Sequence, residues 1–223
     1  MKNYYEAYEE RYQTIHALGY AWAGDRPTPI VEEMLTRYKI PKTAPMLELG
    51  CGEGRDANHL LGEGYDLLAT DISPEAIAWC RKTAPAHADR FRVLDCLRGA
   101  LPAQFDFIYA VAVLHMLTED QDRARFFAFL REHLTESGFA LICTMGDGKF
   151  ERKSDPEEAF DLKLRDHPAG PVMVASTTCR MVSFQTLERE VRESGLTLLE
   201  KGLTASPPEF DSLMYAVVKN PGF

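Results

Sequence analysis

Short apolar runs alternate with segments of helical periodicity along most of the chain. Seven such runs predict β-strands, at 46–49, 66–71, 91–95, 105–111, 139–143, 196–202 and 213–218. Helical patterns cover 2–18, 29–38, 56–61, 118–134 and 183–194, and a further helix begins at Pro74. Strands that alternate with helices at this spacing predict an α/β fold, in which a mostly parallel seven-stranded sheet carries helices on both faces.

Two segments near the end of the chain depart from this alternation. The strands at 196–202 and 213–218 are joined through the loop 205–208 without a helix, so we expect an antiparallel last strand. Residues 146–182 form a polar insertion after the fifth strand. Long insertions are usually functional or mobile, and this one leaves the sheet edge where ligands bind in open α/β folds.

Local signals mark several helix boundaries. Ser73 and Ser183 are good N-caps, and Gly138 is expected to close the helix at 118–134. In the N-terminal helix, one face carries a stripe of apolar side chains, formed by Tyr4, Tyr8, Tyr12 and Ile15.

Composition and charge narrow the possible partners. The 223 residues are 45% hydrophobic and 26% charged, which suits one globular domain over 1–223. The net charge of −9 would repel an extended phosphate backbone, and no basic run offsets it, so no nucleic-acid partner is expected. The longest nearly apolar run, 107–117, is far below the ~20 residues that span a bilayer, so no membrane partner is expected.

Cysteine and histidine spacing gives two further expectations. Five cysteines stand far apart without a C-x-x-C pair, which fits reduced thiols in a cytoplasmic protein better than disulfides. The histidines form neither H-x-x-x-H nor H-E-x-x-H, so no metal site is expected. The oligomeric state stays open.

The glycine-rich turn after the first strand carries the strongest chemical signal. Gly50, Gly52 and Gly54 follow the run 46–49, and glycine permits positive φ and close approach of the backbone to a ligand. Asp71 ends the next strand, 21 residues after Gly50, where a carboxylate can accept from both hydroxyls of a ribose. Together these features predict a nucleoside-binding site.

The glycine spacing discriminates between nucleoside cofactors. The dinucleotide pattern G-x-G-x-x-G would need a glycine at Arg55, whereas this chain has G-x-G-x-G preceded by Glu48. S-adenosylmethionine (SAM) has no pyrophosphate, and its cationic amino-acid end favours nearby carboxylates. Tyr38 and Lys42 have the spacing of a dehydrogenase pair but precede the glycine turn, so a nicotinamide-dependent oxidoreductase ranks last.

At 47–56, Asp71, Asp95 and 105–117 the chain resembles the class I SAM-dependent methyltransferases. Gly-Arg-Asp-Ala at 54–57 is similar to the tellurite-resistance and thiopurine-type branches. The resemblance implies a Rossmann-like sheet, SAM as cofactor with S-adenosylhomocysteine (SAH) as product, and a small-molecule acceptor. It also implies that the helical segment 1–40 and the insertion 146–182 form a substrate cap.

The resemblance further implies which residues bind the cofactor. The glycine turn would contact the methionine and ribose parts of SAM. The end of the second strand would contact the ribose and the adenine, and the end of the third strand would contact the adenine edge. The end of the fourth strand would border the methionine group. These residues are Glu48, Gly50, Cys51, Gly52, Asp71, Ile72, Asp95, Cys96, Ala110 and Val111.

Four more candidates each have a structural alternative. His115 follows the fourth strand as a general base or as a histidine satisfied by local bonds. Trp22, with the tyrosine stripe, would wall the sulfonium by cation–π contact or simply belong to the core. Arg55 would pair with a cofactor or helix carboxylate, or lie on the surface. Arg180 would grip an anionic substrate group, although a surface position is the favoured interpretation.

Methyl transfer from a sulfonium is an in-line displacement, in which alignment of the acceptor can supply on the order of 7–11 kcal/mol. The Asn/Asp-Pro-Pro-aromatic signature of exocyclic-amine DNA methyltransferases is replaced by Ala112-Val113-Leu114-His115, and Ser206-Pro207-Pro208-Glu209 comes too late. A small-molecule methyltransferase is therefore expected, and a non-catalytic SAM-binding module stays the alternative.

Overall fold

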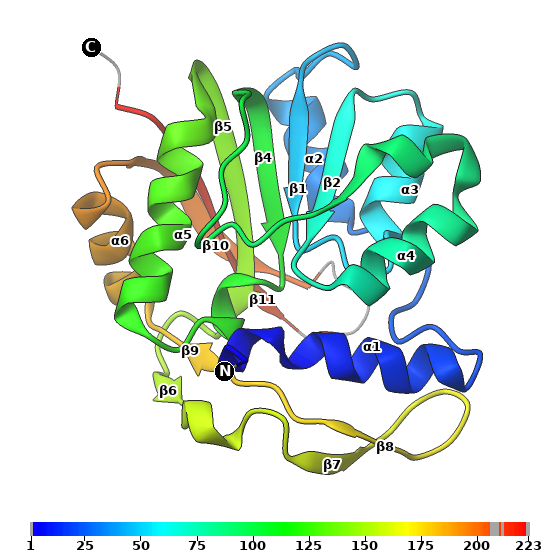
Figure 1. The fold of residues 1–223 in the computed structure, drawn as a ribbon. Coiled ribbons are helices and arrows are strands. Elements are labelled where there is room, and N and C mark those ends of the chain that lie inside the picture. The colour runs from blue at the N-terminus through cyan, green and yellow to red at the C-terminus, as the bar shows by residue number, and fades with distance from the viewer. Residues whose placement is uncertain (1, 206–209, 211, 222–223) are drawn as a thin grey trace.

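The main sheet positions the glycine turn and Asp71, which lie at the ends of β1 and β2. The computed structural model describes residues 2–205, 210 and 212–221. Its seven-stranded sheet has the order β10-β11-β5-β4-β1-β2-β3 (Figure 1). The strands are β1 (Met46–Leu49), β2 (Leu67–Asp71), β3 (Phe91–Val93), β4 (Phe105–Val111), β5 (Leu134–Met145), β10 (Thr197–Thr204) and β11 (Leu213–Lys219). The pairs among β1 to β5 are parallel, and β11 runs antiparallel to β5 and β10, so the predicted fold class is confirmed.

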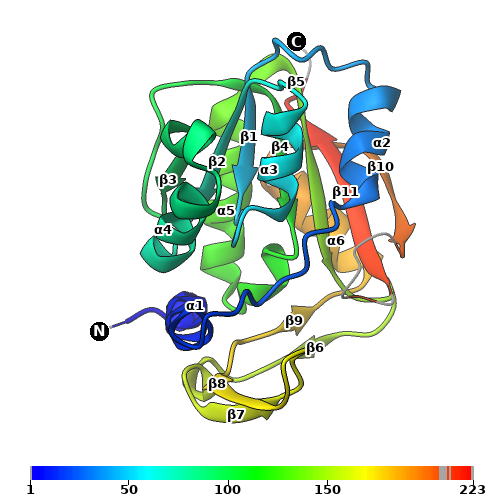
Figure 2. The same ribbon diagram turned by 90° about the vertical axis from the view of Figure 1, so that its right-hand side faces the viewer.

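Helices cover both faces of this sheet (Figures 1 and 2). On one face lie α5 (Asp120–His133) and α6 (Phe184–Glu193), and on the other lie α2 (Pro29–Arg37), α3 (Arg55–Gly62) and α4 (Pro74–Thr83). Met46 and Leu47, neighbours in β1, are buried in opposite clusters because successive side chains of a strand point to opposite faces. The central strands are therefore buried on both sides, as a parallel sheet requires.

The predicted N-caps are confirmed. The Ser73 hydroxyl accepts a hydrogen bond from the Ala76 N–H at the start of α4, and the Ser183 hydroxyl accepts from the Thr186 N–H at the start of α6.

The prediction that Gly138 closes the preceding helix is wrong. α5 ends at His133 and β5 begins directly at Leu134, so Gly138 lies inside the strand. A Cβ there would come within 2.8 Å of the Phe105 carbonyl oxygen, so the glycine serves close strand packing and not a helix end.

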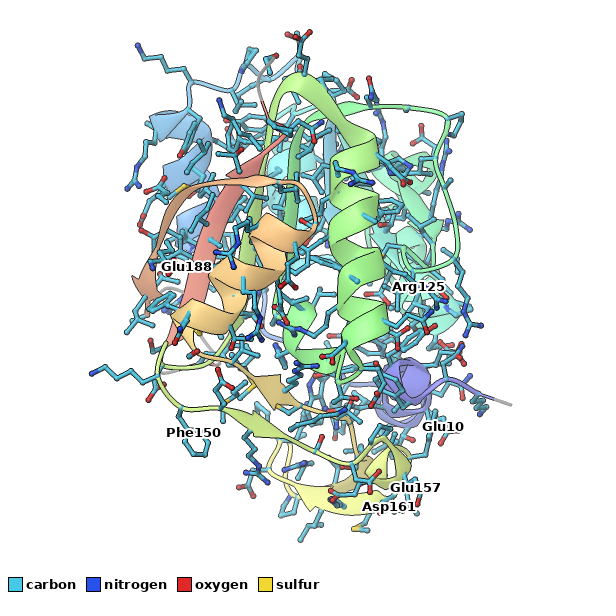
Figure 3. The ribbon with its side chains drawn as sticks, turned by 90° about the vertical axis from the view of Figure 1, so that its left-hand side faces the viewer. Glu10, Arg125, Phe150, Glu157, Asp161 and Glu188 are labelled. Atoms are coloured by element: carbon cyan, nitrogen blue, oxygen red, sulfur yellow. The ribbon has the colours of Figure 1, made fainter. Side chains whose placement is uncertain are left out.

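The insertion folds into two small sheets beyond the carboxyl ends of the main strands. β6 (Arg152–Lys153) pairs with β9 (Arg180–Met181), and β7 (Leu162–Arg165) forms an antiparallel pair with β8 (Val172–Ala175). These short strands were not predicted. Figure 3 shows Glu157 and Asp161 of the insertion on the outside of the molecule, below the sheet.

The N-terminal helix lies between the insertion and the sheet. α1 (Ala7–Ala17) crosses below the carboxyl ends of β1, β2 and β4, with β7 and β8 beneath it (Figures 1 and 2). The Arg11 guanidinium donates to the Ala175 carbonyl of β8 at 2.8 and 3.1 Å. The two segments predicted to cap the site are thus in direct contact.

Two expectations from the sequence can be compared with the structure only within the described residues. Positions 206–208 of the loop between β10 and β11, and Glu209 beside them, lie outside those residues. Among the helices that the structure describes, none combines the length and apolarity of a bilayer span.

Candidate functional site

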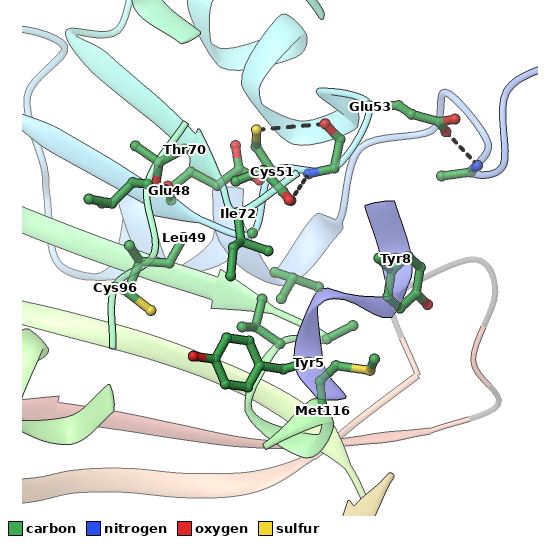
Figure 4. Close-up of a pocket in the computed structure, with 18 of the residues that line it drawn as sticks. Tyr5, Tyr8, Glu48, Leu49, Cys51, Glu53, Thr70, Ile72, Cys96 and Met116 are labelled. Atoms are coloured by element: carbon green, nitrogen blue, oxygen red, sulfur yellow. Dashed lines mark hydrogen bonds between the residues drawn. The ribbon is translucent and has the colours of Figure 1, made fainter. Parts of the chain in front are cut away.

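A pocket opens where β1, β2 and β4 end, and α1 forms its roof (Figure 4). Its cavity volume is about 230 Å³. Most of the sequence-predicted residues line it: Trp22, Glu48, Gly50, Cys51, Gly52, Arg55, Asp71, Ile72, Asp95, Cys96 and Val111. Residues from five different chain segments thus converge on one cavity.

The glycine turn needs its glycines. Gly50, Gly52 and Gly54 have φ of 76°, 53° and 85°, in the left-handed region. A Cβ on Gly50 would lie 2.3 Å from Cγ2 of Val113, and one on Gly52 would lie 2.7 Å from the Tyr12 hydroxyl. The turn is anchored by the N–H groups of Gly50 and Cys51, which both donate to the Thr70 carbonyl at 2.8 and 2.9 Å. Bare backbone therefore faces the pocket.

The Asp71 carboxylate is buried and held from behind by backbone groups. One oxygen accepts from the Gly52 N–H and the other from the Ser73 N–H, each at 2.8 Å. Burial raises the pKa of Asp71, and these two backbone bonds act in the opposite direction. Since each carboxylate oxygen has a second lone-pair site, both can still accept from a ligand in the pocket.

The segment after β3 forms another wall. One oxygen of Asp95 accepts from the Leu97 N–H at 2.9 Å, and the other accepts from the Tyr5 hydroxyl at 3.4 Å. Burial raises the pKa of Cys96 to about 12, so this side chain is a neutral thiol at physiological pH. This wall therefore offers a carboxylate edge beside an apolar surface.

Glu48 is one of the most deeply buried carboxyl groups in the pocket lining. It is 3% exposed and accepts from the Tyr109 hydroxyl at 3.0 Å. Burial raises the pKa of Glu48 well above its usual value, and the charge of Asp56 adds to the rise. The side chain reaches the pocket from β1 while it is fixed by a neighbouring strand.

The N-terminal segment is tied to the glycine turn through Glu53. Its carboxylate accepts from the N–H groups of Trp22 and Ala23, each at 2.7 Å, and lies 2.8 Å from Nε2 of His16 (Figure 4 draws one of these contacts). Trp22 and Tyr8 line the pocket, and the Arg11 guanidinium lies between them, 4.7 and 4.6 Å from the two ring centroids.

Three sequence-predicted residues lie elsewhere in the described structure. Ala110 is buried within β4 and is not among the lining residues. Arg180 donates to the Asp120 carboxylate at 2.6 Å and the Thr118 carbonyl at 2.7 Å, away from the lining. His115 is 4% exposed and outside the lining, and burial with the nearby Arg123 charge lowers its pKa to about 4. Its role as a base stays a prediction that this placement does not favour.

Arg55 is in the lining but is held by protein groups. It donates to the Thr28 hydroxyl at 2.9 Å and lies 3.4 Å from the Asp56 carboxylate. This matches the expected pairing with a helix carboxylate.

Several lining residues were missed by sequence reasoning. Met116 and Leu117 lie in the recognised segment 105–117 and could have been found from it, whereas Tyr5 lies off the predicted stripe. No local sequence pattern marks Phe210 as a pocket residue, because the fold brings it to the pocket only where the chain turns back after β10.

The central segment of the chain matches a known protein family. Residues 47–140 match the family model described as a methyltransferase domain. These residues contain the glycine turn, Asp71, Asp95 and β4, which form most of the pocket floor.

Two curated relatives match about half of the chain. Hemagglutinin 1 of Eikenella corrodens is 34% identical over 118 residues, which are 50% of this chain and 38% of the relative. A probable SAM-dependent methyltransferase, TehB of Haemophilus influenzae, is 26% identical over 117 residues, which are 52% of this chain and 41% of the relative. The chain thus spans about two fifths of the length of these relatives.

Solved structures share the whole fold. The glycopeptide N-methyltransferase MtfA complexed with sinefungin has a TM-score of 0.66 at 23% identity, over 90% of this chain and 89% of that one. The CcbJ methyltransferase of Streptomyces caelestis has a TM-score of 0.69 at 17% identity, over 99% of both chains. A TehB-like SAM-dependent methyltransferase of Corynebacterium glutamicum has a TM-score of 0.60 at 21% identity, over 97% of this chain and 98% of that one.

Proposed function

We propose that this chain transfers the methyl group of SAM to a small-molecule acceptor by in-line displacement. The chain has the class I SAM-dependent methyltransferase fold, and residues 47–140 match a methyltransferase domain. The methyltransferase-domain match at 47–140 and the likeness to a probable SAM-dependent methyltransferase support the predicted enzyme class and SAM as its cofactor. The acceptor and the mechanism are our proposals.

One observation carries the proposal: the bare glycine turn and the Asp71 carboxylate face the same pocket. The glycines leave space that a Cβ would fill, and Glu48, Asp71 and Asp95 give the cavity a set of acidic groups suited to a cationic nucleoside. The residues present therefore fit SAM.

The role of each residue follows from its place in the pocket. We infer that the backbone of 50–52 contacts the methionine and ribose parts and that Asp71 accepts from the ribose hydroxyls. Ile72 and Cys96 would pack on the adenine, with Asp95 accepting from its exocyclic amine. Val111 would border the methionine end, and Glu48 would support the ammonium group.

SAM supplies an already activated methyl group, so the chain must chiefly align the acceptor and exclude water. Tyr5 and Tyr8 of the N-terminal segment and Met116 after β4 enclose the pocket from the side away from the sheet (Figure 4). Tyr12 of α1 also lines the pocket. The insertion lies behind α1 and contacts it through Arg11. We therefore assign the roles of substrate cap to 1–40 and 146–182.

The acceptor class rests on charge and on a structural neighbour. The net charge of −9 disfavours nucleic acids, and the structural neighbour MtfA is a glycopeptide N-methyltransferase. Both support a small molecule as acceptor. The cytoplasmic location stays a prediction from the cysteine spacing.

A turnover assay tests the function. The protein is incubated with SAM and a panel of small amines, thiols, phenols and carboxylates, and SAH release is followed by mass spectrometry. Acceptor-dependent SAH with a matching methylated product supports the enzyme. SAM binding in calorimetry without turnover on any panel member would favour the non-catalytic SAM-binding module.

A further inference from the structure

The hydroxyl of Tyr12 is a buried polar group that faces the pocket. Tyr12 is 7% exposed and lines the cavity. The neighbouring hydroxyls of Tyr4 and Tyr5 donate to Asp122 and Asp95, at 2.8 and 3.4 Å, whereas the described residues offer the Tyr12 hydroxyl no hydrogen-bond partner. Buried tyrosine hydroxyls usually have a partner, so a ligand group is the natural candidate.

The surroundings of this hydroxyl place it beside the glycine turn. A Cβ on Gly52 would lie 2.7 Å from the hydroxyl oxygen, so the glycine leaves room for it. Burial raises the pKa of Tyr12 well above its usual value, and the charge of Asp71 is the next cause. The hydroxyl therefore keeps its proton at physiological pH and can donate a hydrogen bond close to the Asp71 carboxylate.

The Tyr12 ring is fixed from behind. It stacks on the His16 ring at a centroid distance of 5.7 Å, and the His16 nitrogens lie 2.8 Å from carboxylate oxygens of Glu53 and Glu75. A ring held in this way presents its hydroxyl in one direction, which preorganises it for a ligand.

We propose that the Tyr12 hydroxyl and the Asp71 carboxylate form a clamp on the two ribose hydroxyls of the cofactor. The clamp rests on the proposed function. Asp71 accepts from the ribose, using the lone pairs that the Gly52 and Ser73 N–H groups leave free, and Tyr12 donates to a ribose oxygen from α1. α1 thereby contributes a specificity residue to a site whose other sugar contacts come from the glycine turn and the end of β2.

The test compares two ligands on two variants. The ligands are SAH and an SAH analogue that lacks both ribose hydroxyls, and their affinities are measured by calorimetry. Tyr12→Phe removes only the hydroxyl, and Tyr4→Phe is the matched control because Tyr4 pairs with Asp122 outside the lining. We expect Tyr12→Phe to weaken SAH binding by roughly 3- to 10-fold and to leave binding of the analogue unchanged, while Tyr4→Phe changes neither.

Three other outcomes would each contradict the clamp. Unchanged SAH affinity in Tyr12→Phe overturns the clamp and leaves the proposed function standing. An equal loss for SAH and the analogue also overturns it, because the phenol would then act through packing alone. If wild-type protein binds neither SAH nor SAM, the proposed function and the clamp fail together.

Discussion

At the scale of single residues, the pocket gathers carboxyl groups that differ in what holds them. Asp71 is anchored by two backbone N–H groups, whereas the buried Glu48 has one hydroxyl donor, from Tyr109. Backbone donors favour the ionised form of a carboxyl group, and burial disfavours it. The two residues should therefore respond differently to substitution.

Loss of the Asp71 carboxylate should weaken SAM binding at least tenfold without unfolding the protein. Charge-assisted bonds to the ribose are each worth about 1.5–3 kcal/mol, and Asp71→Ala removes them. Calorimetry with SAM checks the affinity, and circular dichroism checks the fold. Asp66→Ala is a suitable control, because Asp66 pairs with Arg90 on the surface. Equal SAM affinity in the two variants would exclude the ribose assignment.

Glu48→Gln should stabilise the ligand-free protein at neutral and alkaline pH. The raised folded-state pKa of Glu48 means that ionisation opposes folding. This penalty is absent below the unfolded-state pKa, grows as the pH rises towards the folded-state pKa, and is full above it. The amide oxygen can still accept from Tyr109. Each 1 kcal/mol gained corresponds to roughly 2–4 °C in Tm, and a Tm difference that did not shrink at acid pH would contradict the explanation.

Gly50→Ala should destabilise the fold by about 1–3 kcal/mol and weaken SAM binding, because it combines a strained φ with a clash. The new Cβ would lie 2.3 Å from Val113. Gly64→Ala is the matched control, since Gly64 has φ of 86° but open space around its Cβ position. Chemical denaturation of both variants separates strain from clash, and equal losses would show that the clash is relieved at no cost.

At the scale of elements, α1 forms the roof of the pocket (Figure 4). It is fastened to the glycine turn by Glu53, which accepts from Trp22, Ala23 and His16, and to the insertion by Arg11. These polar contacts therefore help to hold the roof of the pocket in place.

Glu53→Ala should loosen α1 and weaken SAM binding by about tenfold. The change leaves two backbone N–H groups and His16 without their acceptor, and such unpaired groups cost about 1–3 kcal/mol each when they stay buried. Hydrogen exchange over residues 7–17 measures the loosening. Glu10→Ala is the control, since the Glu10 carboxylate pairs with the exposed Lys2. Similar exchange in both variants would show that Glu53 does not hold the roof.

At the scale of the whole molecule, the sheet, α1 and the insertion follow one another in three successive layers (Figure 2). The insertion contacts the outer side of α1, so we expect a ligand bound in the pocket to reduce the mobility of both segments.

Residues 146–182 should be cleaved by trypsin faster in ligand-free protein than with saturating SAH, and slowest when an acceptor from the turnover assay is added. The lysines and arginines of this segment at which trypsin can cleave are Lys149, Arg152, Lys153, Lys163, Arg165 and Arg180. Mass spectrometry of the fragments over time gives the rates. Identical rates in all conditions would count against a cap.

The pattern of the sequence predicted the main fold well, because burial on both faces of a parallel sheet produces continuous apolar runs that local reading detects. Sequence reasoning failed at Gly138, because glycine serves both at helix ends and where strands pack closely. Gly138 has the sequence signature of a helix end, yet it is glycine because the Phe105 carbonyl approaches it across the sheet. The insertion escaped assignment because its strands are short, at two to four residues each.

The sequence by itself determined the seven strands, the glycine turn and the position of Asp71, because periodic burial and the need for positive φ act between near neighbours. Only the tertiary structure decided that the tyrosines of the N-terminal segment face the glycine turn, that Arg180 pairs with Asp120, and that His115 is buried outside the lining. Such contacts join residues as far as 164 positions apart, as for Arg11 and Ala175, and no local pattern encodes them.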